Sequence, residues 1–125
     1  MEEYKFSFEK LDVWQNSRIF VKSVYQIIGR LPREEKFAIS NQLRRSSVSV
    51  SSNIAEGSSR LSPKEKIRFV EMAYGSLLET YCQIQLCIDL GYISDIDTSD
   101  CKKLIFKISK QLSSLKKSIE TKSNT

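Results

Sequence analysis

The sequence predicts an all-α protein, an antiparallel up-down bundle of four helices in one domain. Four stretches repeat apolar residues every three or four positions, the spacing that gathers side chains on one face of an α-helix. The chain of 125 residues contains only four glycines and two prolines, too few for the many turns of a β-sandwich or barrel. A chain of this length can bury a single hydrophobic core. We therefore assign residues 1–120 to one bundle domain.

The first helix is expected over residues 10–31. Its main apolar line consists of Phe20, Val24, Ile27 and Leu31, spaced by four, three and four. Pro32 ends it, because a proline disfavours helical geometry in the residue before it. Upstream, aromatic and polar side chains alternate over residues 4–8, which predicts an extended arm lying on the bundle.

The second helix is expected over residues 34–57, with acidic residues in its first turn, where the helix dipole favours them. Gly57 is predicted to close it as a left-handed C-cap. Residues 48–51 alternate valine and serine as a strand would, but this run lasts four residues inside a longer helical repeat, which we expect to prevail. This helix carries four small polar residues that would let another helix approach closely: Ser46, Ser47, Ser51 and Ser52. Their hydroxyls can donate hydrogen bonds to backbone carbonyls one turn back.

The third helix, over residues 63–91, starts with the capping sequence SPKE at 62–65 and ends at Gly91. It carries more apolar residues than one contact face needs, and a helix that is apolar on two sides has a second partner. We expect that partner to be another copy of the chain. The residues off its main stripe are Phe69, Met72, Ala73, Leu78 and Leu86.

The fourth helix is expected over residues 95–120, with Ser94 as its N-cap and a frayed tail over 121–125. Residues 101–122 contain seven lysines and one acid, a net charge of +6, so that the rest of the chain sums to −1 within the total of +5. Such a stripe is either a solvated helix face or a surface for a polyanion such as RNA or DNA. The candidate phosphate contacts are Lys102, Lys103, Lys107, Lys110, Lys116 and Lys117, together with Arg44 from the second helix.

No enzymatic activity is expected. The chain has no histidine, which excludes Ser-His-Asp and Cys-His nucleophiles, imidazole zinc sites and the Glu-x-x-His motif of di-iron bundles. Neither GxGxxG nor GxxxxGK[ST] occurs. We predict no metal and no cofactor. Three cysteines without a CxxC pair, no signal-like start and no long apolar run predict a soluble, cytoplasmic protein with reduced thiols and no membrane contact.

Five short motifs stand out along the chain: LDVWQ at 11–15, QLRR at 42–45, NIAEG at 53–57, AYGSLLE at 73–79 and LGYI at 90–93. Together they resemble the four-helix-bundle family of 23S rRNA intervening-sequence proteins. The resemblance covers roughly residues 6–118. The chain departs from the family pattern at Ser46-Ser47, where alanine is frequent, and at 37–39, where Phe-Ala-Ile replaces Tyr-Gly-Leu.

The resemblance implies a homopentameric barrel of four-helix bundles and no catalytic site. Some members of the family are encoded within insertions in bacterial 23S rRNA genes, and a related branch, the accessory variability proteins of diversity-generating retroelements, binds a reverse transcriptase and nucleic acid. Two functions follow: a homo-oligomer that binds RNA or DNA, or a scaffold that docks a polypeptide such as a reverse transcriptase. The matching signature residues, read as bundle and subunit contacts, are Gln42, Arg45, Asn53, Glu56, Gly57, Gly75 and Glu79.

Overall fold

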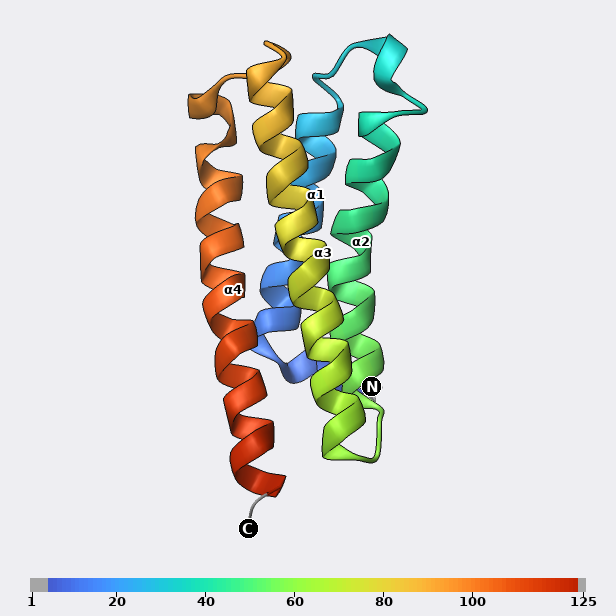
Figure 1. Cartoon of the computed structure of the whole chain (residues 1–125), viewed down its shortest axis with the longest axis vertical. Helices are drawn as coiled ribbons and strands as arrows, with labels where there is room; N and C mark the ends of the chain where they lie inside the picture. The colour runs from blue at the N-terminus through green and yellow to red at the C-terminus, as the bar shows by residue number, and fades with distance from the viewer. Residues whose placement is uncertain (1–4, 124–125) are drawn as a thin grey trace, which may run out of the picture.

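A computed structural model describes residues 5–123 as six helical elements (Figure 1). Two are short 3₁₀ turns, η1 (Ser7–Lys10) and η2 (Arg33–Glu35). The four long helices are α1 (Asp12–Ile28), α2 (Ile39–Ser58), α3 (Pro63–Asp89) and α4 (Asp95–Ser123). No strand occurs within these residues, so the prediction of an all-α bundle is confirmed.

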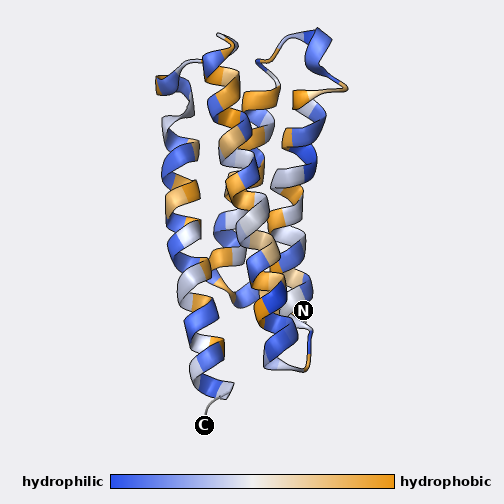
Figure 2. Cartoon of the chain, viewed as in Figure 1, coloured by the Kyte–Doolittle hydropathy of each residue, from blue (hydrophilic) through white to orange (hydrophobic). Residues whose placement is uncertain are grey.

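The four helices run alternately up and down, and each packs against two others (Figure 1). α2 lies between α1 and α3, whereas α4 lies between α3 and α1 and makes no contact with α2. Apolar side chains meet along the axis, and the outer faces are largely hydrophilic (Figure 2). The largest fully buried side chains come from all four helices: Phe20, Leu43, Leu77, Ile84, Ile108 and Leu112.

The N-terminal arm differs from its prediction. Residues 7–10 form the turn η1 instead of continuing an extended arm, and the Phe6 N–H donates to Glu9 Oε1 at 3.0 Å. The Phe8 ring packs edge-on against Trp14 with 4.8 Å between ring centroids. Tyr4, where the predicted arm begins, lies outside the described residues. Of the two described aromatic residues of the arm, Phe8 packs on α1, whereas Phe6 is 74% exposed.

The second helix begins later than predicted. Residues 33–35 form the separate turn η2, and Ala38 (φ −117°, ψ −112°) is not helical, so α2 starts at Ile39. The acids are therefore not in its first turn. Instead, Glu35 Oε1 accepts a hydrogen bond from Tyr92 Oη at 2.9 Å, which joins the two loops at this end of the bundle. This hydrogen bond is the main cause of the raised pKa of Tyr92.

The starts of α3 and α4 follow the sequence. Ser62 Oγ accepts from the Glu65 N–H, and Ser94 Oγ accepts from the Asp97 N–H, both at 3.1 Å. Asp97 also forms an ion pair at 3.1 Å with Arg30, which lies two residues beyond the end of α1. The Ser94 hydrogen bond, followed by the Arg30 guanidinium, holds the pKa of Asp97 below its usual value. The segment expected to fray is helical as far as Ser123, and residues 124–125 lie outside the described part.

Gly57 is not a left-handed C-cap. It lies in the last turn of α2, is buried, and lacks a positive φ; among the described residues only Gly91, after α3, has one (77°). A Cβ at Gly57 would lie 2.8 Å from Phe69 Cβ, shorter than such contacts in real structures. Glycine is needed here because α2 and α3 approach so closely.

The close approach at Gly57 predicts opposite effects for two glycine substitutions. Gly57→Ala should lower the free energy of unfolding by about 1–2 kcal/mol, since the cost of overpacking exceeds the gain in helix propensity. Gly75→Ala is the matched control, because nothing lies within 4 Å of a Cβ at that helical position. It should stabilise the fold by about 0.5–1 kcal/mol. Urea unfolding followed by circular dichroism measures both; equal shifts would contradict the packing argument.

Candidate functional site

Four of the predicted phosphate contacts share the outward side of α4. Lys103, Lys107, Lys110 and Lys117 are exposed, and none has an ion pair within residues 5–123. Their spacing places them opposite the buried stripe that includes Ile105 and Ile108. At 1.5 Å per residue the group extends about 21 Å along the helix axis. We call these four residues the lysine face.

Two other predicted contacts are engaged within the chain. Lys102 Nζ lies 2.6 Å from Asp95 Oδ1, and its side chain is only 17% exposed. Lys116 Nζ lies 3.5 Å from Glu71 Oε1 on α3. Both lie toward the sides of α4, so the structure separates them from the lysine face.

Arg44 does not join the α4 lysines. It belongs to α2, which is diagonal to α4 in the bundle and does not contact it. There it lines a shallow groove with Tyr25, Arg45 and Val48. A ligand would need to pass around a neighbouring helix to touch both Arg44 and α4.

An exposed aromatic ring adjoins the lysine face. Phe106 is 56% exposed, and its ring contacts Tyr81 of α3 edge-on at a centroid distance of 5.8 Å. Lys103 and Lys110 stand three residues before it and four after it, so they are its neighbours on the helix surface. The spacing of the lysines alone does not reveal this ring, although the position of Phe106 between Lys103 and Lys110 is a signal for it in the sequence.

A buried hydrogen-bonded group joins α2 to α3. Ser46 Oγ lies 2.7 Å from Thr80 Oγ1 and 3.0 Å from Gln83 Oε1, and all three residues are buried. Thr80 Oγ1 also bonds to the Ser76 carbonyl at 2.9 Å. No described buried side-chain nitrogen or oxygen lacks a partner. We call Ser46, Thr80 and Gln83, with the polar residues that extend them, the polar seam.

The polar seam continues outward into the signature residues. Gln83 Nε2 donates to Glu79 Oε1 at 3.2 Å and, more weakly, to Gln42 Oε1 at 3.4 Å. Further along, Asn53 Nδ2 donates to the carbonyl and hydroxyl of Ser49, both at 2.9 Å, and Ser49 Oγ lies 2.9 Å from Ser76 Oγ. Gln42, Asn53 and Glu79 are therefore brought together along one helix pair.

The remaining signature residues have different surroundings. Glu56 lies 3.8 Å from Arg60, whose guanidinium stacks over the Phe69 ring at 4.5 Å from its centroid. Gly57 permits the contact with Phe69, whereas Gly75 is exposed and packs against nothing within its own chain. Arg45 is exposed and forms no ion pair within residues 5–123.

Several of the apolar residues off the main stripe of α3 pack against other helices of the same chain. Phe69 and Ala73 are buried, and Phe69 meets Gly57 of α2. Only Leu78 and Leu86 remain large exposed apolar residues of that set, at 48% and 47%. The predicted breadth of the α3 apolar surface is thus explained largely by its position between α2 and α4.

No cluster of reactive groups emerges from the geometry. Burial is the first cause of the raised pKa values of Cys87 and Cys101, which keeps both thiols protonated. Within residues 5–123, no three His, Cys, Asp or Glu side chains are placed to share a metal ion. None of the described helices is long and apolar enough to cross a membrane.

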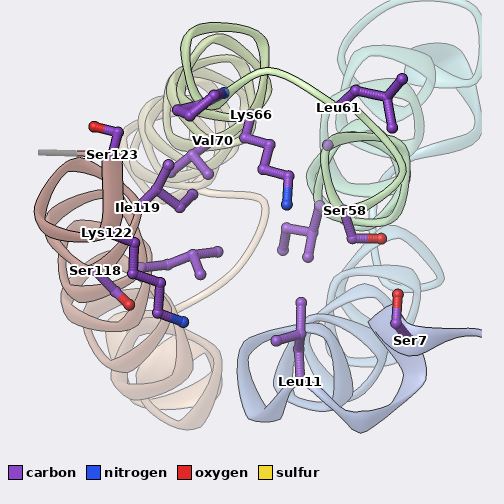
Figure 3. Close-up of a pocket in the computed structure, with 14 residues that line it drawn as sticks. Ser7, Leu11, Ser58, Leu61, Lys66, Val70, Ser118, Ile119, Lys122 and Ser123 are labelled. Carbon is purple, nitrogen blue, oxygen red and sulfur yellow. The ribbon is translucent and has the colours of Figure 1, made fainter. Parts of the chain in front are cut away.

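A cavity of about 350 Å³ opens between the helices at the end of the bundle where α2 ends and α3 begins (Figure 3). Its inner wall is apolar, and the side chains of Lys66 and Lys122 reach into the space. The sequence gives no sign of this cavity, because it depends on how far each helix extends past its neighbours.

These features define an antiparallel four-helix-bundle protein with a polar helix–helix seam and a one-sided basic surface. The chain belongs to the 23S rRNA-intervening sequence protein family, whose model matches residues 9–114. The expected family membership is confirmed. No curated protein matches the chain.

A crystal structure of a protein from Bacteroides thetaiotaomicron has the same fold, with a TM-score of 0.77 and 27% sequence identity. The match covers 84% of this chain and 98% of that one. That protein is described as one of unknown function from the S23 ribosomal protein family.

Removal of one hydroxyl from the polar seam should lower the free energy of unfolding. Thr80→Val keeps the shape but leaves Ser46 with fewer buried partners, so we expect a loss of about 1–3 kcal/mol in the free energy of unfolding. Ser52→Ala, at an exposed position of α2, should change it by less than about 0.5 kcal/mol. Chemical unfolding of both variants tests this, and a neutral Thr80→Val would show that the seam adds no stability.

Proposed function

We propose that this protein is a non-enzymatic, homo-oligomeric bundle that binds RNA or DNA through the lysine face. The observation that supports it is the exposure of four ammonium groups on one side of α4, with no acidic residue between positions 101 and 119. A solvated helix face that served only solubility would carry mixed charges. A polyanion would instead gain from counterion release at each phosphate contact.

The site favours single strands over sequence-specific duplex recognition. Base-edge readout in duplex DNA requires an element that enters a groove and side chains that form bidentate hydrogen bonds to bases. The lysine face has only point charges and the exposed Phe106 ring. Any base can stack on an aromatic ring, and exposed lysines can follow the backbone of an unpaired strand.

Replacing three residues of the lysine face should remove nucleic-acid binding. We expect Lys103→Glu, Lys110→Glu and Lys117→Glu together to reduce affinity for a fluorescent single-stranded RNA by at least about a hundredfold at low salt, because three attractive charges become repulsive. Fluorescence anisotropy over a salt series should also show a flatter dependence on salt.

The matched control places the same charge change elsewhere. Lys10, Lys22 and Lys64 are exposed and lie outside α4, and their replacement by Glu gives the same net charge. The control should retain most of the affinity. Equal losses in both triple variants would mean that only the overall charge matters, and unchanged affinity in the α4 variant would overturn the proposal.

We also propose that the outer side of α2 and α3 joins copies of the chain into the homopentamer that the family resemblance implies. Arg45 supports this assignment, because it is an exposed cation without an ion pair in the described chain and is flanked on its helix by Gln42 and Ser49.

Light scattering coupled to size exclusion tests the assembly. The unmodified chain should elute well above its monomer mass of 14.4 kDa. Arg45→Glu should shift it toward that mass, whereas Arg33→Glu in η2 should not. A monomer at micromolar concentration would contradict the oligomer, and an unaffected Arg45→Glu assembly would move the contact to another face.

The alternative function, a scaffold that docks a polypeptide such as a reverse transcriptase, also has a supporting feature. Tyr81 and Phe106 form an aromatic pair between α3 and α4 that stays partly exposed. Such a protein would show no affinity for RNA at physiological salt. The anisotropy experiment therefore separates the two functions.

A further inference from the structure

The end cavity arises from an offset between helices. Asn16 Nδ2 of α1 donates to Gln111 Oε1 of α4 at 3.0 Å, which places these residues at the same height. α1 begins at Asp12, only four residues below that level, while α4 continues to Ser123, twelve residues beyond it. The last two turns of α4 therefore pass the start of α1, and no long helix of the described residues fills the space beside them.

The cavity wall is apolar where it meets the core. Ile54 and Val70 are buried core residues, and Leu11, Leu115 and Ile119 pack against the same core. These five side chains come from all four long helices or their immediate flanks. An apolar chain entering here would exchange contact with water for contact with aliphatic side chains.

Among residues 5–123, the charged side chains that line the cavity are lysines. Lys66 from α3 and Lys122 from α4 both extend into the space between the helices (Figure 3). No aspartate or glutamate side chain among residues 5–123 lines the cavity. Ser118 of α4 also lines the cavity, whereas the Ser58 hydroxyl donates to the Ala55 carbonyl at 2.8 Å. An anionic group would thus meet ammonium and hydroxyl donors beside an apolar wall.

From this arrangement we infer that the cavity binds a single-chain amphiphile with an anionic head, a medium-chain fatty acid carboxylate. The chain occupies the wall of Ile54, Val70 and Ile119, and the carboxylate accepts hydrogen bonds from Lys66. A volume of about 350 Å³ lies near the lower end of ligand pockets, which span about 300–1,000 Å³. It suits one short acyl chain, not a lipid with two.

This site is independent of the lysine face. Lys66 lies on α3 at the end of the bundle, and the cavity includes none of the four residues of the lysine face. A failure of either proposal leaves the other intact.

Titration of the full chain with sodium decanoate, kept below its micelle-forming concentration, tests the inference. Methyl NMR should show saturable shifts confined to the cavity residues Ile54, Val70, Leu115 and Ile119. Decanol, which lacks the charge, and butyrate, which lacks the chain, should each bind at least about tenfold more weakly. Decyltrimethylammonium, with the opposite charge, should not bind.

Two variants and a control sharpen the test. Lys66→Gln should weaken decanoate binding about tenfold or more, as expected for loss of a charge-assisted hydrogen bond, while decanol binding stays unchanged. Ile119→Trp should fill the cavity and abolish binding without loss of helicity. Lys110→Gln removes the same charge from the outward side of α4 and should leave binding unaltered.

The inference is overturned by any of three results. These are the absence of a saturable shift with decanoate, shifts that fall outside the cavity, and binding of decyltrimethylammonium as tight as that of decanoate. Equal weakening by Lys66→Gln and Lys110→Gln would likewise show a general charge effect instead of a built site.

Discussion

The hydrogen-bonded contact between α2 and α3 is the constraint on which the bundle depends. Ser46, Thr80 and Gln83 are buried, and polar groups in a core are costly unless each has a partner. Their partners lie on the facing helix, so a shift of one helix along the other would break several bonds at once. An apolar contact would tolerate such a shift more easily. The polar seam therefore sets the register of α2 and α3, and Gly57 sets how closely their ends approach.

The other two helices complete the core on the side away from the seam. α1 and α4 pack on the pair chiefly through aliphatic and aromatic side chains such as Phe20, Val24, Ile108 and Leu112. Because α4 makes no contact with α2, its outward side is remote from the seam, and charge there costs the fold little. The molecule thus presents a polar, partly buried surface along α2 and α3 and a strongly basic surface on α4.

Periodicity was enough to predict the four helices and most of their core residues, because burial of one face is what the spacing encodes. The start of α2 could not be predicted, since the acids at 33–35 belong to a turn that ends at the non-helical Ala38. Gly57 fits a cap by sequence position, yet its role comes from Phe69 on another helix. The partners of Ser46 and the end cavity likewise depend on which helices face each other and how far they are offset.

Most of the family signature residues lie along the contact between α2 and α3. Gln42, Asn53, Gly57 and Glu79 are explained by contacts along α2 and α3, and of these four only Gly57 also lines the end cavity. Residues that build the fold are expected wherever the fold is kept, as in the protein from Bacteroides thetaiotaomicron that shares it at 27% identity. They carry little information about what the molecule binds. Ligand specificity should instead reside in side chains that the bundle does not need for folding, and the exposed lysines and Phe106 of α4 meet that condition.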